Sequence, residues 1–498
     1  MKRIKRLVIL GGGTAGWMTA AALSATFGKT LAISLLESDT IGTVGVGEAT
    51  IPTIHWFNEL IGLNEAEFVR ATKASFKLGI EFVDWARPGS RYFHPFGRYG
   101  VDLGRVPFHQ CWLRAQGDGA DRPLSAFSLA AQLAEEGRFT KPVSDPRSIL
   151  STLGYAYHFD AGLYARHLRG LAEANGVTRY EGVLQKVERN AETGFVTVLS
   201  TDRGERLEGD LFIDCSGFRA LLIGDAMGAS FEDWSNWLPC DRAVAVPCTR
   251  VQETTPFTRS TLRPAGWQWR IPLQHRTGNG YVYSSPFLSD DEAAATLLGN
   301  LDGEPLADPR LLRFKAGFRR EAWRGNVVAI GLSSGFLEPL ESTSIHLIQS
   351  AIAKLITLFP DADCNPGLAR QFNTVFGRDM DGIRDFLILH YHATTGHDAP
   401  LWRYTRNMTL PDTLIDKEEQ YTQAGRLMLG SDDLFREASW LAVLNGQGIH
   451  ARNPSPLAET LDGDANMRQL EQIEAVVARA VHTFPKHDDA IRTMIGEA

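Results

Sequence analysis

The stretch RLVILGGGTAGWMTAAALSATFGKTLAISLLES, residues 6–38, predicts the fold of the first part of the chain. It opens with an apolar run typical of a buried strand (6–10), followed by a glycine-rich turn (11–16). An apolar helix that ends at Gly28 comes next, and a second apolar strand follows it. Strand, helix and strand in this order form a βαβ unit, so we expect an α/β fold with a Rossmann-like parallel sheet.

Gly11, Gly13 and Gly16 form the pattern GxGxxG at the turn between the first strand and the helix. Glycines have no side chain, so a pyrophosphate can approach the backbone at the positive end of the helix. Glu37 ends the second strand about twenty residues further on, where a carboxylate can accept hydrogen bonds from a ribose hydroxyl. The alternative is a tight turn that only joins strand to helix, but the whole combination favours a dinucleotide.

The dinucleotide is expected to be FAD, because a second glycine-rich stretch (42–52) and a late strand-to-glycine turn (210–217) suit contacts along a long cofactor. The remaining glycine pairs, GDGAD (117–121) and GNGYVY (278–283), lack the third glycine and the following helix that an NAD(P)H site would need. Reduced flavin would then come from a separate NAD(P)H-dependent reductase.

Length and composition are those of a globular chain that acts on a small molecule. Its 498 residues predict two or three packed units, and 44% are hydrophobic. The net charge of −8 argues against nucleic acid or an anionic membrane as partner. The five cysteines are scattered without a CxxC pair, which fits neither a metal site nor a disulfide framework and favours a reducing cytoplasm.

The N-terminus resembles a signal peptide, because MKRIKR (1–6) is followed by an uncharged segment to residue 27. The alternative of a secreted protein is weakened by the glycines that interrupt this segment, which the dinucleotide turn explains better. No other segment reaches the roughly 20 apolar residues that a membrane helix requires.

The rest of the chain predicts further strands and then helices. A helix is expected to begin near Asp160 and to stop at Gly176, and strands are expected over 177–190, 194–201 and 210–214. From about residue 345 the pattern is mostly helical.

The segment GWQWRIPL (266–273) contains two tryptophans one residue apart and a proline that ends a strand. Considered alone, it predicts a half-buried strand with Trp267, Trp269 and Ile271 on one face. A functional role for the pair is the alternative.

Several motifs together resemble the flavin-dependent halogenases, in the tryptophan-halogenase branch. In chain order these are GGGTAGWMTA (11–20), GVGEATIP (45–52), FKLGIEFVDW (76–85), WQWRIP (267–272) and LEPLEST (337–343). The resemblance runs from about residue 6 to about residue 450. It implies a reaction in which FADH2 and O2 oxidise chloride or bromide to hypohalous acid, which travels through a tunnel to an aromatic substrate.

The resemblance also assigns residues to the cofactor and the tunnel. Expected FAD contacts are Gly11, Gly13, Thr14, Ala15, Gly16, Glu37, Ala49, Leu184, Leu332 and Ile345. Trp267, Trp269, Ile271 and Pro272 would line the tunnel and keep the organic substrate away from the flavin. An FAD-dependent aromatic monooxygenase is the alternative enzyme, but it would need an open path to the flavin. A non-catalytic FAD-binding protein is less compatible with the catalytic residues below.

Lys77 corresponds to the essential lysine of the family. The alternation of FKLGIEFVDW by itself predicts a lysine on a solvated strand face. At the dry end of a tunnel, desolvation would disfavour its charge, and the amine would hold hypohalous acid next to one ring carbon.

Glu341 corresponds to a second catalytic acid, which would polarise hypohalous acid or accept the ring proton. Its alternative role is a carboxylate that stabilises the start of the following helix. The backbone N–H groups of Thr343 and Ser344 correspond to a halide site. The usual glycine is Ser344 here, which would alter the halide geometry if that position required a glycine backbone angle.

His94 and Phe96 correspond to residues that flank an indole ring, and Trp440 to a residue that stacks on it; core packing is the alternative for each. The segment before Trp440, GSDDLFREAS (430–439), lacks the paired tyrosines and acid that hold free tryptophan in the family. We therefore expect an indole-like compound or a larger aromatic partner. The sequence is compatible with a monomer or a homodimer.

The implied domain organisation is an aromatic-hydroxylase-like FAD-binding fold with additions. Residues 1–345 would form the FAD-binding and halogenation core, with sheet insertions on the substrate side at about 75–155 and 225–315. Residues 346–498 would form a mainly helical subdomain that covers the substrate site.

Overall fold

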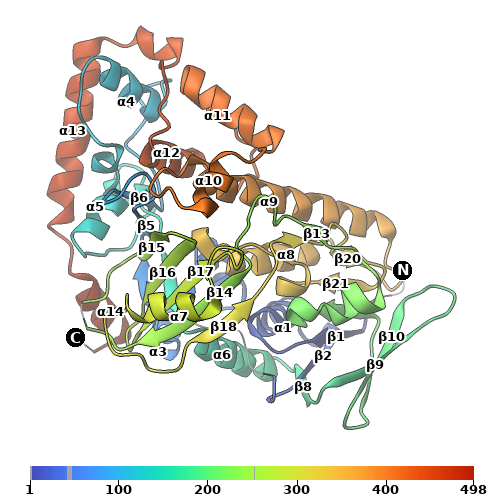
Figure 1. Ribbon diagram of the computed structural model, residues 1–498. Coiled ribbons are helices and arrows are strands. Elements are labelled where there is room, and N and C mark those ends of the chain that lie inside the picture. The colour runs from blue at the N-terminus through green and yellow to red at the C-terminus, as the bar shows by residue number, and fades with distance from the viewer. Residues whose placement is uncertain (1–2, 42–46, 252, 498) are drawn as a thin grey trace. The chain divides into compact units, whose positions relative to one another are not determined.

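The structure is a computed structural model that describes residues 3–41, 47–251 and 253–497 (Figure 1). Its internal contacts divide the chain into two units. Unit 1 comprises residues 1–74, 159–235 and 313–381, and unit 2 comprises residues 75–158, 236–312 and 382–498. The expected sheet insertions overlap the first two segments of unit 2, whereas the expected boundary after residue 345 falls inside unit 1.

A six-stranded sheet forms the centre of unit 1, in the order β20-β21-β12-β1-β2-β8. Its strands are β1 (Arg6–Leu10), β2 (Ala32–Glu37), β8 (Thr178–Glu181), β12 (Leu211–Asp214), β20 (Trp323–Arg324) and β21 (Val327–Ala329). All neighbours are parallel except β20 and β21. The predicted Rossmann-like α/β core is therefore confirmed.

The helices of unit 1 include the two predicted after the glycine turn and near Asp160. They are α1 (Thr14–Phe27), α2 (Ile54–Leu60), α3 (Glu65–Ala71), α6 (Ala161–Ala174), α8 (Ser344–Thr357) and the first part of α9 (Pro366–Ala393). Helix α1 ends at Gly28, as expected. Helix α6 begins after Asp160, whose carboxylate accepts a hydrogen bond from the N–H of Leu163 at 3.0 Å.

Unit 1 also contains a three-stranded sheet, which packs against the main sheet through a shared apolar cluster. Its strands are β9 (Leu184–Arg189), β10 (Val196–Thr201) and β11 (Arg206–Glu208), and Figure 1 shows β9 and β10 in green beside β8. Leu199 of this sheet and Val8 and Phe212 of the main sheet are buried in the same cluster. The short strands are β3 (Glu48–Ala49), β13 (Glu232–Asp233), β19 (Gly317–Phe318) and β22 (Gly335–Phe336).

Unit 2 contains a seven-stranded sheet in the order β18-β14-β17-β16-β15-β5-β6. Its strands are β5 (Gly79–Val83), β6 (Arg91–Pro95), β14 (Arg242–Cys248), β15 (Thr258–Arg263), β16 (Gly266–Pro272), β17 (Thr277–Tyr283) and β18 (Arg310–Arg313). A separate short pair, β4 (Ser75–Lys77) and β7 (Ala156–Phe159), is antiparallel. The segment predicted as one alternating strand is thus broken at Leu78.

The strand β16 is buried on both faces, so the prediction of a half-buried strand is wrong. It lies between β15 and β17, and Trp267, Trp269 and Ile271 are 1%, 6% and 6% exposed. Gln268 on the opposite face is also buried. Both tryptophans therefore belong to the interior of unit 2, and the predicted strand end at Pro272 is confirmed.

Unit 2 also contains many helices, and most of them lie in its last segment. They are α4 (Phe108–Gly117), α5 (Leu129–Glu135), α7 (Asp290–Leu298), the second part of α9, α10 (Pro400–Arg406), α11 (Asp412–Ala424), α12 (Glu437–Gly446), α13 (Gly463–Val481) and α14 (His487–Ile495). Within the described residues, every helix is too short or too polar to cross a membrane.

Candidate active site

The glycine turn of unit 1 packs closely against neighbouring backbone because side chains are absent from it. Gly11 has a φ of +108°, and a Cβ added there would lie 2.2 Å from the carbonyl oxygen of Cys215. A Cβ on Gly16 would lie 1.8 Å from the carbonyl oxygen of Gly11. No side chain caps the start of α1 at Gly13, so its first N–H groups suit a pyrophosphate. The predicted residues Thr14 and Ala15 open this helix.

Glu37 lies at the carboxyl end of β2, beside the glycine turn. A Cβ on Gly12 would lie 1.5 Å from Oε2 of Glu37, so the carboxylate faces the turn closely. Its Oε1 accepts a hydrogen bond from Nε of Arg179 at 2.5 Å, and Nε1 of Trp17 donates to Oε2 at 3.4 Å. Arg179, on the neighbouring strand β8, was not predicted from the sequence; it holds the carboxylate of Glu37 in place beside the turn.

Of the other expected FAD contacts of unit 1, one lies in a turn close to the start of α1. The turn that holds Leu332 approaches α1, because a Cβ on Gly331 would lie 2.8 Å from Cβ of Ala15. Ala49 and Ile345 are buried, in β3 and at the second residue of α8. Leu184 instead packs against the apolar cluster between the two sheets. Residues 42–46 of the predicted glycine-rich stretch lie outside the described residues.

The segment before α8 places an acid and a helix start together in unit 1. Glu341 ends a short 3₁₀ turn and is 1% exposed. Thr343, and not Glu341, is the residue that precedes α8, so the helix-capping interpretation of Glu341 is not supported. Thr343 is fully buried, and its hydroxyl oxygen has no hydrogen-bond partner among the residues that the structure describes. A buried hydroxyl at a helix start is suited to an anion.

Ser344 does not require a glycine backbone. It is the first residue of α8, and the left-handed residue of this segment is Ser342, with a φ of +60°. The expected distortion from serine at position 344 therefore has no basis in the backbone. Two residues after Ser344, Nδ1 of His346 lies 3.0 Å from the hydroxyl of Thr53, and burial lowers the pKa of His346 to about 4.

Lys77 is fully buried in unit 2, so its interpretation as a lysine on a solvated face is wrong. It ends β4, and its Nζ lies 5.1 Å from the centre of the Phe96 ring. The two residues meet because the N–H of Phe96 donates to the carbonyl of Leu78 at 2.7 Å. The amine is therefore buried and lies beside an aromatic ring.

The predicted tunnel residues are joined to the lysine strand. The rings of Trp267 and Trp269 have centres 6.1 Å apart. A Cβ on Gly280 of β17 would lie 2.0 Å from the Trp269 ring, so glycine makes space for this indole. At the end of β16, the carbonyl of Pro272 accepts a hydrogen bond from the hydroxyl of Ser75 at 2.6 Å.

His94 and Trp440 belong to one buried aromatic cluster of unit 2. Phe386 contacts both, with ring centres 5.9 Å from His94 and 5.1 Å from Trp440. Phe435 stacks on Phe386 at 3.9 Å and lies 6.3 Å from His94. Phe96 is instead beside Lys77. Phe386 and Phe435 were missed from the sequence, because isolated phenylalanines in helical and loop segments resemble ordinary core residues.

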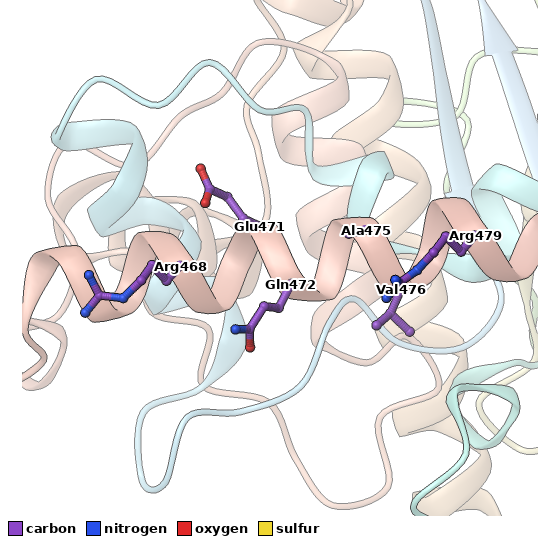
Figure 2. A pocket seen from close by; sticks show the side chains of 6 residues that line it. All are labelled: Arg468, Glu471, Gln472, Ala475, Val476 and Arg479. Atoms are coloured by element: carbon purple, nitrogen blue, oxygen red, sulfur yellow. The ribbon is translucent and has the colours of Figure 1, made fainter.

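A hollow on the surface of α13 is separate from these residues. Figure 2 shows the side chains that line it, all from one helix: Arg468, Glu471, Gln472, Ala475, Val476 and Arg479. It contains none of the predicted site residues.

Comparison with known proteins agrees with the sequence resemblance. The family profile described as tryptophan halogenase matches residues 6–463. The tryptophan 6-halogenase SttH of Streptomyces toxytricini is 35% identical over 98% of this chain and 98% of its own length. The structure of BrvH, a flavin-dependent halogenase from Brevundimonas sp. BAL3, has 47% identity and a TM-score of 0.95 over 99% of both chains. Xcc4156, a flavin-dependent halogenase from Xanthomonas campestris, has 45% identity and a TM-score of 0.95, again over 99% of both chains. The chain therefore belongs to the tryptophan halogenase family of flavin-dependent halogenases.

Proposed function

We propose that this halogenase chlorinates or brominates an indole-like aromatic compound, and that Lys77 directs the oxidant to the ring. Family membership favours this reaction over that of an aromatic monooxygenase. When reduced FAD is bound, it supplies the two electrons of the first step: FADH2, O2, halide and a proton yield FAD, water and hypohalous acid. In the second step the acid replaces a ring hydrogen with halogen and releases water.

The observation that carries the proposal is the burial of Lys77. Its side chain is fully buried, with Nζ over the Phe96 ring. In such an environment the N–H donors of the amine bind the oxygen of hypohalous acid without competition from water. The halogen is thereby held in one place and reacts with one ring carbon.

The start of α8 is proposed as the halide site. The N–H groups of Thr343 and Ser344 belong to the first turn, which has no helical acceptors for them. The buried hydroxyl of Thr343 adds a donor that has no partner within the described part of the chain. Glu341, buried two residues earlier, would polarise the acid or accept the ring proton.

An indole-like substrate is favoured by the aromatic residues of unit 2. SttH is named as a halogenase of tryptophan, but the segment 430–439 of this chain has no tyrosines to hold an amino acid. His94 and Trp440, joined by Phe386, present aromatic faces that suit a flat, electron-rich ring.

The test is a bromination assay with purified protein, FAD, NADH, an unrelated flavin reductase, O2, bromide and indole. Mass spectrometry should detect monobrominated indole with wild type and none with Lys77→Ala. Lys29→Ala, which removes an exposed lysine, is the matched control and should retain activity. Hydroxylated indole formed without halide, or full activity of Lys77→Ala, would contradict the proposal.

A further inference from the structure

The strand that carries Lys77 is held by buried histidines. Strand β4 is only three residues long and pairs with β7. One histidine, His487, contacts its backbone at Phe76, and another, His158, contacts its side chain at Ser75. Both contacts are therefore made within two residues of Lys77, whose amine is proposed to direct hypohalous acid.

His487 accepts a hydrogen bond from the lysine strand. The N–H of Phe76 donates to Nε2 of His487 at 3.0 Å. Nδ1 of the same ring lies 2.8 Å from the carbonyl oxygen of Thr254, which can only accept. The hydrogen is therefore on Nδ1, and Nε2 has the lone pair that Phe76 requires.

The environment of His487 keeps this ring neutral. The side chain is 1% exposed, and burial lowers its pKa to about 4. A protonated ring would lose the acceptor for Phe76. His487 opens α14, which lies beyond residues 6–463, the part of the chain that the family profile matches.

His158 contacts β4 at Ser75, and Ser75 in turn contacts Pro272 at the end of β16. The hydroxyl of Ser75 donates to the carbonyl of Pro272 at 2.6 Å, so its oxygen accepts from Nδ1 of His158 at 3.0 Å. Nε2 of His158 then accepts from the hydroxyl of Thr258 at 2.9 Å. The ring is fully buried, and burial, followed by the nearby charge of Lys77, lowers its pKa well below the usual value.

We propose that His487, supported by His158 through Ser75, is a positioning residue for Lys77. The proposal rests on the function proposed above. The rings fix residues 75 and 76 without adding a positive charge beside the amine, and the side chain of Lys77 therefore starts from one defined backbone position. A displaced amine would fail to retain hypohalous acid, although the acid would still be formed.

The test compares two amides at position 487. In His487→Gln, Oε1 of the new side chain reaches the place of Nε2 and still accepts from Phe76. In His487→Asn, the shorter side chain reaches only the place of Nδ1, so this acceptor is lost. His482→Ala, which removes an exposed histidine near the end of α13, is the matched control.

Two readouts separate positioning from loss of the fold. One is the fraction of oxidised FADH2 that appears as brominated indole, and the other is the hypohalous acid captured by an added 1,3-diketone. We expect His487→Asn to lower the brominated fraction about tenfold and to raise captured acid, because small displacements of a catalytic group cost this much or more. The Gln variant and His482→Ala should stay within about twofold of wild type.

Ser75→Ala supplies an independent variant if the His487 variants do not fold. It removes the hydroxyl that links His158 to Pro272. Like His487→Asn, it should lower the fraction of brominated indole and raise the amount of captured hypohalous acid. The inference would be overturned if His487→Asn kept the wild-type fraction of brominated indole. It would also be overturned if the Asn and Gln variants lost the same share of that fraction. If Lys77→Ala were fully active, the proposed function itself would fail; an inactive Lys77→Ala beside a normal His487→Asn would overturn the positioning role alone.

Discussion

The glycine turn of unit 1 and the lysine strand of unit 2 are built in different ways. The turn is made by backbone: Gly11 and Gly16 contact each other within one βαβ unit, and Gly11 also contacts Cys215, which follows the distant strand β12. The surroundings of Lys77 come from distant segments that contribute Phe96 and, through β4, His158 and His487. A site made by backbone is sensitive to backbone shape, whereas a site made by side chains is sensitive to side-chain contacts.

Gly11→Ala is expected to have the largest effect, because it tests the dependence of unit 1 on backbone shape. The new Cβ would lie 2.2 Å from the carbonyl oxygen of Cys215, at a φ of +108°. Strain of about 1–3 kcal/mol, together with displacement of the turn, should weaken FAD binding by about 100-fold. Titration of FAD fluorescence measures this change.

Gly170→Ala is the control for that prediction. Gly170 lies inside α6 with nothing within 4 Å of an added Cβ. It should leave FAD affinity unchanged and stabilise the fold by about 0.5–1 kcal/mol. Equal FAD affinity in both variants would show that the glycine turn does not depend on its backbone shape.

His487→Gln should change how stability depends on pH, which tests the dependence of unit 2 on side chains. Burial lowers the pKa of His487 from 6.5 to about 4. The unfolded chain therefore binds a proton on His487 below pH 6.5 that the folded chain does not bind. The stability contributed by the neutral ring is complete above pH 6.5 and is lost as the pH falls towards 4.

The difference in unfolding free energy between wild type and His487→Gln should shift by roughly 3 kcal/mol between pH 7 and pH 4, to the disadvantage of wild type. Urea unfolding at several pH values measures it. His482→Ala, at an exposed histidine, should show no comparable shift relative to wild type. Parallel pH profiles for wild type and the Gln variant would contradict the buried, neutral state of His487.

Gly280→Ala tests a contact between neighbouring strands in unit 2. An added Cβ would lie 2.0 Å from the Trp269 ring and would displace this indole at a cost of about 1–3 kcal/mol. Gly382→Ala, in α9 with nothing within 4 Å of its Cβ, is the matched control. Urea unfolding should separate the two variants, and similar stabilities would show that Trp269 moves freely.

The sequence predicted unit 1 well because its signals are local. The periodicity of residues 6–38, the glycine pattern and the cap at Asp160 each act within a few residues, and the structure contains the expected elements. Arg179 was missed, because its place beside Glu37 depends on the pairing of β2 with β8, which spacing along the chain does not reveal.

Unit 2 was harder to predict because its environment is made by distant segments. Alternation around Lys77 indicated a solvated face, but the strand breaks at Leu78 and the lysine is buried. An alternating pattern in residues 266–273 likewise indicated that β16 is half-buried. A period of two shows which residues share a face, but it does not show whether another segment covers the second face. His487 had no local signal at all: its importance depends on α14 reaching β4.

Arg179→Gln should have the smallest effect, a modest loss of FAD affinity, and it tests how much side-chain charge contributes to the glycine turn of unit 1. The guanidinium holds Oε1 of Glu37 at 2.5 Å, so its loss leaves the carboxylate less ordered beside the glycine turn. Partly exposed ion pairs contribute about 0.2–1 kcal/mol, which corresponds to an FAD affinity weaker by at most about fivefold. Arg203→Gln removes a more exposed arginine, 3.6 Å from Glu181, and should leave the affinity unchanged. Because the effect is electrostatic, it should shrink at high salt; a loss as large as that of Gly11→Ala would mean that side-chain charge, and not backbone shape, determines cofactor binding in unit 1.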